Sequence, residues 1–307
     1  MQYWTMGSSA SSVEALKGPL LDFPAHEWFK VVLVRIKAGH GYIYLGDTDQ
    51  YAALGTAPAS GIPALVTESG TIETIRALSE DYENRGEDSF SIELKQNGDA
   101  LIRKKRLIYG TGYGSFRKGY KEMPPEEQRR RFQEIVSSIS KAAVAESPYM
   151  VSCDTYPAIE EFTVSVSSYA VRQDDRLSLF IPGIAASVAG VTGDERFNPL
   201  YRDYPTHSIM TVEVLLPEGV RSIEAMPPES VRYHMPGSGD ITLETKVVSP
   251  PSDNLDQPGR TRIVVVQRTD LKPMLLMPDE YPALLDIQRS LSHPRMRTLM
   301  VRMGEGK

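Results

Sequence analysis

Cysteine is almost absent from this sequence, which contains only Cys153 among 307 residues. A disulfide cannot form within the chain, and a metal site built from several cysteines is excluded as well. As a nucleophile, Cys153 would need a base beside it. Its surroundings, MVSCDTY, are strand-like. They belong to a different predicted domain from His26, a histidine that could serve as such a base. We therefore predict a buried structural cysteine.

Long hydrophobic runs are also missing. No stretch approaches the ~20 consecutive apolar residues of a membrane-spanning helix, so no membrane span is expected. Residues 1–18, MQYWTMGSSASSVEALKG, have neither the basic start nor the apolar centre of a signal peptide. They form no convincing element of their own, and we therefore expect that a further N-terminal domain precedes them.

Positive charge is not in excess either. The 34 Lys and Arg residues stand against 40 Asp and Glu residues, a formal net charge of −6. A nucleic-acid-binding domain would need a basic face, so a nucleic acid is not an expected partner. Two short basic runs, Arg103–Arg106 and Arg129–Arg131, are predicted to form a solvated strand edge and a solvated helix face.

The sequence is rich in short apolar segments separated by turn residues. The β-branched run Phe29–Ile36, the turn Gly39–Gly41 and the segment Tyr42–Leu45 predict a hairpin. The Asn-Gly pair in Gln96–Asp99 favours a tight turn between two further strands. Other strands are predicted from alternating or β-rich patterns at Asp88–Leu94, Ala100–Tyr109, Glu161–Val171, Arg176–Phe180, Met210–Leu216, Ser230–His234, Ile241–Val248 and Arg262–Thr269.

Two helices are predicted among the strands. The first begins at Pro124–Glu127, where a proline in the first turn and two acids near the positive end of the dipole favour a helix start. It is expected to end near Ala145. Its apolar residues recur at helical spacing and predict one buried stripe made of Phe132, Ile135, Val136 and Ile139. The second helix is Pro278–Leu291. The glycine-rich Gly110–Gly114 (GTGYG) lacks the lysine of a phosphate-binding loop and is predicted to be a β-corner.

These patterns predict an α+β fold that is mainly β, with antiparallel β-sandwich-like modules, one long helix and a C-terminal helix. We expect three domains. They are residues 1–70, residues 71–205 with the helix at about 124–145, and residues 206–307 with the terminal helix.

The candidate catalytic residues lie near the first hairpin. His26 precedes the Phe29–Ile36 strand, and Asp47 and Asp49 follow the next strand within Gly41–Gly55 (GYIYLGDTDQYAALG). A histidine before one strand and a carboxylate after the next form the orienting half of a nucleophilic triad. The alternative is that His26 is a surface histidine and that Asp47 and Asp49 belong to a polar turn. The spacing by itself favours this alternative. A calcium site at the two aspartates is not expected because too few oxygen ligands follow at loop spacing, and no cofactor is expected.

The segment Phe23–Gly55 resembles the end of a transglutaminase-like domain of the papain-like cysteine-protease superfamily. YLGDTDQYAALG is similar to the turn after the last strand of such domains. The following LG-T-x-P is similar to the segment in which their chain leaves this final strand. The closing LPEGV, MPPESVRY and PDEYPALL segments resemble β-rich domains of unknown function that follow this core in large bacterial multi-domain proteins. The resemblance implies that His26 is the base and Asp47 the orienting carboxylate of a partial Cys-His-Asp triad. The family's cysteine would lie upstream of Met1.

Two functional hypotheses follow. The first is the C-terminal part of a transglutaminase-like protein, with residues 1–70 as the remnant of its core. The intact protein would carry out acyl transfer or amide hydrolysis on a protein or peptide substrate, and this chain would be inactive without the nucleophile. The alternative is a non-enzymatic β-sandwich protein that serves binding or assembly at the bacterial cell envelope. The resemblance also implies a periplasmic or secreted location.

Overall fold

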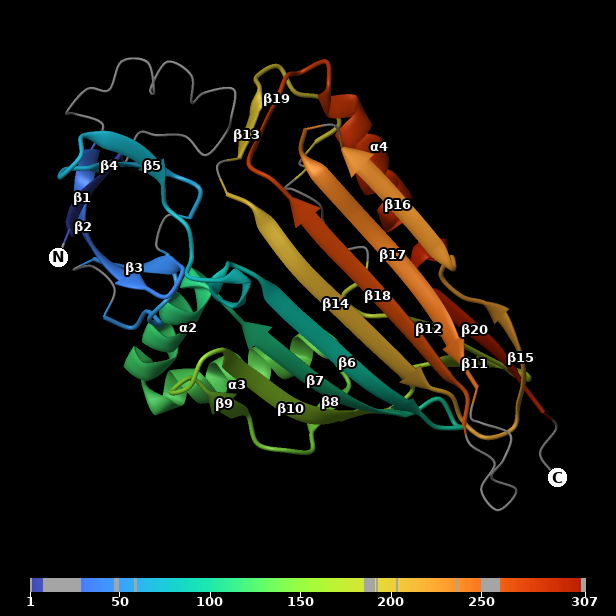
Figure 1. Cartoon of the computed structure of the whole chain (residues 1–307). Helices are drawn as coiled ribbons and strands as arrows, with labels where there is room; N and C mark the ends of the chain where they lie inside the picture. Colours follow the sequence, from blue (N-terminus) through green and yellow to red (C-terminus); the bar gives the residue numbers. More distant parts are fainter. Residues whose placement is uncertain are drawn as a thin grey trace.

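A computed structural model describes residues 2–7, 29–46, 50–57, 60–184, 191, 193–202, 204–235, 237–249 and 260–304. Strands dominate in these ranges, and the fold is α+β and mainly β, as the sequence predicts. The strands form a five-stranded, a nine-stranded, a four-stranded and a two-stranded sheet (Figure 1). None of the helices in the described ranges is long and apolar enough to cross a membrane.

The N-terminal sheet has five strands in the order β3-β2-β1-β4-β5. Its strands are β1 (Gln2–Gly7), β2 (Phe29–Ala38), β3 (Gly41–Leu45), β4 (Pro63–Val66) and β5 (Thr71–Thr74). The expectation that residues 1–18 contain no element of their own is wrong, because β1 pairs with β2 and β4. The predicted first hairpin is confirmed, because β2 and β3 pair antiparallel across the turn that contains Gly39. This sheet has a small core of its own, made of Leu33, Tyr44, Ala57, Ala64, Val66 and Ile75.

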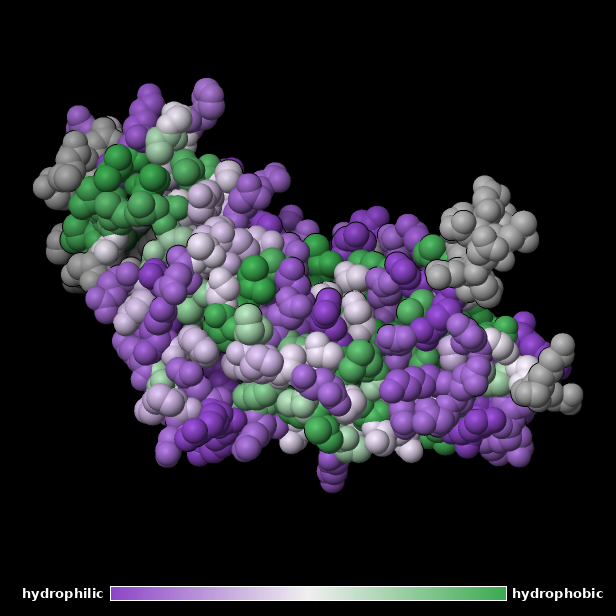
Figure 2. All heavy atoms as spheres, turned by 90° about the horizontal axis from the view of Figure 1, so that it is seen from below, coloured by the Kyte–Doolittle hydropathy of each residue, from purple (hydrophilic) through white to green (hydrophobic). Residues whose placement is uncertain are grey.

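Apolar side chains also lie on the outer side of the N-terminal sheet. Val32, Ile36 and Leu45 are exposed by 56%, 41% and 37%. Figure 2 shows apolar side chains gathered at the left, over this sheet, whereas polar and apolar side chains are interspersed over the remainder of that view.

The nine-stranded sheet is the main element of the fold. Its order is β16-β17-β18-β14-β6-β7-β10-β8, and β9 also pairs with β10. β6 and β14 are parallel, and its other strand pairs are antiparallel. The strands are β6 (Gly86–Leu94), β7 (Ala100–Ile108), β8 (Ala143–Ala145), β9 (Met150–Ser152), β10 (Ala158–Val166), β14 (Thr206–Leu215), β16 (Ser230–Met235), β17 (Gly239–Val248) and β18 (Arg262–Leu271). The sheet contains strands from before and after residue 205, where the second predicted domain ends. The division into three domains stays a prediction.

One face of the nine-stranded sheet is covered and the other is open. Behind the sheet in Figure 1 lie α3 (Pro125–Ile139), α4 (Tyr281–Ser292) and the four-stranded sheet β11-β12-β20-β15. That sheet consists of β11 (Val171–Gln173), β12 (Arg176–Phe180), β15 (Val220–Ala225) and β20 (Thr298–Met303). All these layers contribute to one large core, because the alternation of apolar residues along each strand directs them to the same side. A short pair, β13 (Leu200–Arg202) and β19 (Met274–Leu276), completes the set of strands.

The glycine-rich segment is helical, so the predicted β-corner is wrong. Helix α2 (Thr111–Glu122) begins directly after Gly110, which has a φ of 64°. The side chain of Asn84 caps this helix from another part of the chain. Its Oδ1 accepts hydrogen bonds of 2.6 Å from the backbone nitrogen of Thr111 and 2.8 Å from its hydroxyl. A capping side chain 27 residues away leaves no local signal in the sequence.

The two predicted helices exist with different bounds. α3 ends at Ile139 instead of near Ala145, and residues 143–145 form β8. The stripe on α3 is confirmed, since its apolar residues pack on the large core. α4 confirms the terminal helix. The strand predicted at Glu161–Val171 ends at Val166, where a turn with Ser168 at a φ of 52° separates β10 from β11.

Candidate functional site

The predicted triad residues lie outside the part of the chain that the structure describes. This holds for His26, Asp47 and Asp49 alike. The described residues contain the hairpin between them, and β3 ends at Leu45, two positions before the first aspartate. The partial triad therefore stays a prediction.

Cys153 is a buried residue, as the sequence predicts, with 3% of its surface exposed. Its backbone carbonyl accepts a 2.9 Å hydrogen bond from the hydroxyl of Tyr113 on α2. Burial raises the pKa of the Cys153 thiol, and the nearby Lys121 opposes this only in part. A thiol with a raised pKa holds little of the reactive thiolate at neutral pH. Cys153 is thus poorly suited to act as a catalytic nucleophile.

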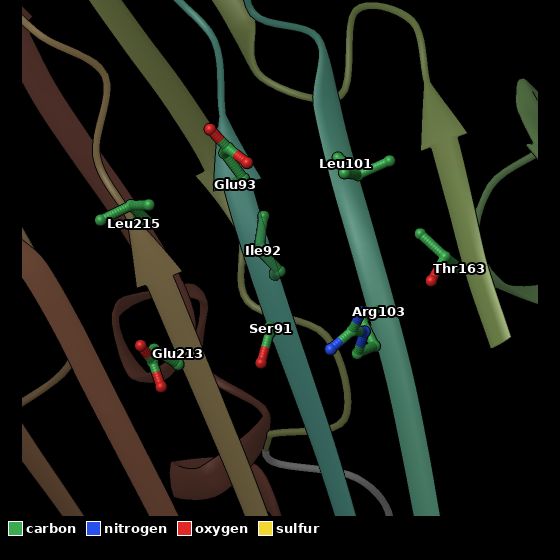
Figure 3. Close-up of a pocket in the computed structure, with 8 residues that line it drawn as sticks. All are labelled: Ser91, Ile92, Glu93, Leu101, Arg103, Thr163, Glu213 and Leu215. Atoms are coloured by element: carbon green, nitrogen blue, oxygen red, sulfur yellow. The ribbon is translucent and has the colours of Figure 1, made fainter. Parts of the chain in front are cut away.

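A shallow groove lies on the open face of the nine-stranded sheet, with a volume of about 260 Å³. It crosses β14, β6, β7 and β10, and Figure 3 shows the side chains around it. The small side chain of Ser91 lies in the middle, between Glu213 and Arg103 on the neighbouring strands. The groove exists because a serine occupies a position between longer neighbours. Its lining consists of Ser91, Ile92, Glu93, Leu101, Arg103, Thr163, Glu213 and Leu215.

Apolar and polar residues alternate in a row across the sheet beside this groove. The strand register places the residues side by side, one from each strand. From β17 to β8 the row is Val248, Arg262, Leu215, Glu93, Leu101, Ser165 and Val144. Val144 and Leu101 are among the exposed large apolar residues of the chain, at 62% and 37%. This row offers apolar contact area and charged groups at the same surface.

The charges around the groove form ion pairs along its border. Glu213 lies 2.8 Å from Nε of Arg262, and Glu93 lies 2.5 Å from Nη1 of Arg260. Arg103 is held more loosely, with its Nε at 3.6 Å from Glu161 and its side chain 65% exposed. Exposed ion pairs each contribute only ~0–1 kcal/mol to folding. Arg103 can therefore exchange its present partner for that of a ligand at little cost to stability. Arg260 is held more firmly, because it is only 22% exposed and also donates hydrogen bonds to the carbonyl oxygens of Leu216 and Leu94.

The basic run Arg103–Arg106 is not a strand edge, so this prediction is wrong. The run lies in β7, which pairs with β6 on one side and β10 on the other. Successive residues of a strand point to opposite faces. Arg103 and Lys105 therefore lie on the open face, and Lys104 and Arg106 lie on the face that α3 covers. Sequence reasoning recognised the run but could not tell which strands would flank it.

A second polar cluster lies at one end of the same open face. Nδ1 of His234 lies 2.8 Å from Oδ1 of Asp240, and Nδ1 of His207 lies 3.0 Å from Oδ1 of Asp270. Hydrogen bonds from Arg232 and from His234 lower the pKa of Asp240 to about 2. Sequence reasoning assigned no role to either histidine, because the strand register that pairs them with aspartates is not visible in the sequence. Within the described ranges, no group of three or more His, Cys, Asp or Glu residues is placed to hold a metal ion.

The fold and this surface define an α+β, mainly β protein with one open sheet face. No family model and no curated protein matches the chain. Among solved structures, it is similar to a chain from Parabacteroides distasonis ATCC 8503 named a "putative protease", with 11% identity and a TM-score of 0.48. The match covers 98% of this chain and 40% of the other. A likeness at this level carries no argument about function.

Proposed function

We propose that this chain is a non-enzymatic binding protein, and that the open face of the nine-stranded sheet binds a polypeptide segment. The groove at Ser91, with its alternating apolar and charged surroundings, is the observation that supports this proposal. Apolar side chains of the partner would contact Leu101 and Leu215. Its charged side chains would pair with Arg103 and Glu93.

The composition of the open face favours a polypeptide over other partners. Acids and bases are interspersed along the rows of the sheet, which gives no continuous basic surface for nucleic acid or anionic lipid. The strand positions that alternate with the buried ones in β6, β7 and β10 hold no Phe, Tyr or Trp in the described residues. Sugars and unpaired bases are commonly held by stacking on such rings. Mixed apolar and charged side chains are the chemistry that a peptide can match.

The absence of an activated thiol supports the non-enzymatic part of the proposal. A cysteine enzyme needs a thiolate beside a base. Cys153 is instead buried, with a raised pKa. We therefore expect that the purified chain does not turn over glutamine-donor or peptide substrates.

The experiment is a selection of random linear peptides against the purified chain, followed by affinity measurements on individual peptides. Ser91→Trp fills the groove on an exposed strand position, where an aromatic residue is compatible with β-structure. We expect it to abolish binding of the selected peptides. Ser137→Trp, on an exposed position of α3, is the matched control and should leave binding unchanged. Peptides that bind Ser91→Trp as well as the original chain would refute the proposal.

The second candidate is the transglutaminase-like lineage, in which this chain is an inactive C-terminal part. The hairpin of β2 and β3 favours it, since this is the local structure that the resemblance requires between His26 and Asp47. The test is turnover. A purified chain that processes a glutamine-donor or peptide substrate, and loses this activity on His26→Ala, would contradict the expected inactivity and support a functional base.

A further inference from the structure

The two basic runs of the sequence meet at a pocket on the covered side of the nine-stranded sheet. Its volume is about 130 Å³, and it lies between β7, β10 and α3. A single water molecule needs roughly 10–15 Å³ on this measure, so the pocket has room for several waters or for a short organic molecule. The lining residues are Lys104, Arg106, Arg131, Ile135, Glu160 and Phe162.

Three cations from two different elements line this pocket. Lys104 and Arg106 are two residues apart on β7 and therefore share a face of the sheet. Arg131 lies on α3, one turn before Ile135, and therefore on the same side of that helix. The strand supplies two of the positive groups, and the helix above it supplies the third.

The cations are only loosely paired with carboxylates. Asp88 lies 4.0 Å from Nζ of Lys104 and 3.8 Å from Nε of Arg106. Glu160 lies 3.5 Å from Nη1 of Arg106, and it also accepts a hydrogen bond from the hydroxyl of Tyr149. Charge-assisted hydrogen bonds normally measure about 2.7–2.9 Å. The nitrogens of Lys104 and Arg106 thus retain donors that these carboxylates do not saturate.

The positive charge of Arg131 is compensated even less by carboxylates. No ion pair joins it to a carboxylate among the residues that the structure describes, whereas its neighbour Arg130 lies near Glu127 and Glu134. Three cations against the two carboxylates of Asp88 and Glu160 leave one uncompensated positive charge at this pocket.

We propose that the pocket between α3 and strands β7 and β10 binds a small organic monocarboxylate. One carboxylate neutralises the surplus charge, and its two oxygens suit the paired donors of a guanidinium. The side chains of Ile135 and Phe162 supply an apolar wall for a short alkyl group. The two negative charges of a dianion would exceed the one uncompensated positive charge. Such an anion would therefore be repelled by Asp88 and Glu160.

The probe for this proposal is butyrate, measured by saturation-transfer NMR and by titration against the full chain. Butanamide has nearly the same shape but no charge, so it should bind much more weakly. Removing one charged hydrogen-bond donor commonly weakens binding about tenfold. We expect this loss in Arg131→Gln, which keeps a helix-favouring side chain at the same position of α3.

Arg130→Gln is the matched control. It removes the neighbouring guanidinium, which is 71% exposed and outside the pocket, and it should leave butyrate affinity unchanged. Lys104→Met, measured in parallel, should also weaken binding and tests the strand side of the pocket. Equal affinity for butyrate and butanamide, equal losses in Arg130→Gln and Arg131→Gln, or tighter binding of inorganic phosphate than of butyrate would overturn the proposal. So would the absence of butyrate binding to the unaltered chain.

Discussion

The hydroxyl of Tyr113 donates a 2.9 Å hydrogen bond to the carbonyl oxygen of Cys153, and the two residues are 40 positions apart in the sequence. This bond attaches helix α2 to the segment that holds the single thiol. Ile108, Tyr113, Cys153 and Ala158 form a small apolar cluster at this point. The thiol is therefore part of the packing between a helix and the sheet.

The first prediction concerns the reactivity of Cys153. Because the thiol is buried and its pKa is raised, we expect slow reaction with iodoacetamide in the folded chain and fast reaction in guanidinium chloride. The thiol pKa is higher in the folded state, so its contribution to stability is complete below the ordinary cysteine pKa. It is lost as the pH rises through the folded value. Rapid, complete labelling of the folded chain at neutral pH would contradict this account.

The second prediction concerns Gly110, which begins helix α2. A Cβ at this position would lie 2.7 Å from the backbone nitrogen of Asn84, and the φ of 64° disfavours any other residue. Gly110→Ala should lower the free energy of unfolding by at least about 1 kcal/mol. Urea unfolding followed by circular dichroism measures this change.

Gly119 provides the control, because it lies inside the same helix and a Cβ added there would meet no atom of a neighbouring element. Gly119→Ala should raise the free energy of unfolding by about 0.5–1 kcal/mol, since alanine favours helices over glycine. If both substitutions change stability in the same direction, Gly110 does not have the special role described for it.

The glycine-rich segment shows what local sequence could and could not predict. α3 was predictable because its proline start, its acids and its apolar stripe all lie within the helix itself. α2 was missed because its cap, Asn84, belongs to another part of the chain, and its three interior glycines favour other structures. The hairpin of β2 and β3 was predictable from strand patterning and a short turn. The register of distant strands, which forms the groove and the basic pocket, was not.

The third prediction concerns the ionisation of Asp88. Burial raises the pKa of this carboxyl above 3.8, and the nearby Arg106 and Lys104 offset the effect only in part. A raised carboxyl pKa means that its contribution to stability is complete below the unfolded pKa and is lost as the pH rises through the folded value. Asp88→Asn, which resembles the neutral form, should therefore gain stability relative to the unaltered chain as the pH rises above the unfolded carboxyl pKa.

Asp99 is the control for this pH dependence, because its pKa is shifted in the opposite direction. The backbone nitrogen of Ser168 and the side chain of Asn97 donate hydrogen bonds to its carboxylate and lower its pKa. This contribution is present above the unfolded pKa and is lost as the pH falls through the folded value. Asp99→Asn should lose stability relative to the unaltered chain as the pH rises. If the stability changes of the two variants vary with pH in the same direction, the opposite pKa shifts assigned to Asp88 and Asp99 are refuted.

The fourth prediction concerns Arg202, which is 8% exposed and belongs to β13. Its Nε and Nη1 are buried without a hydrogen-bond partner among the residues described, and its guanidinium lies 4.5 Å from the ring centre of Tyr204. A cation–π contact contributes ~1 kcal/mol, whereas burial of an unpaired charge costs several kcal/mol. We expect Arg202→Met, which keeps an unbranched chain of similar reach, to raise the free energy of unfolding by about 1 kcal/mol or more.

The exposed Arg172 provides the reference for Arg202. Arg172→Met should change the free energy of unfolding by no more than about 0.5 kcal/mol, as is usual for surface positions. Urea unfolding of both variants separates the effect of burial from the general effect of losing one arginine. A clear destabilisation by Arg202→Met would mean that this guanidinium has a counter-charge in the native protein, because only a compensated buried cation contributes favourably to the folded state.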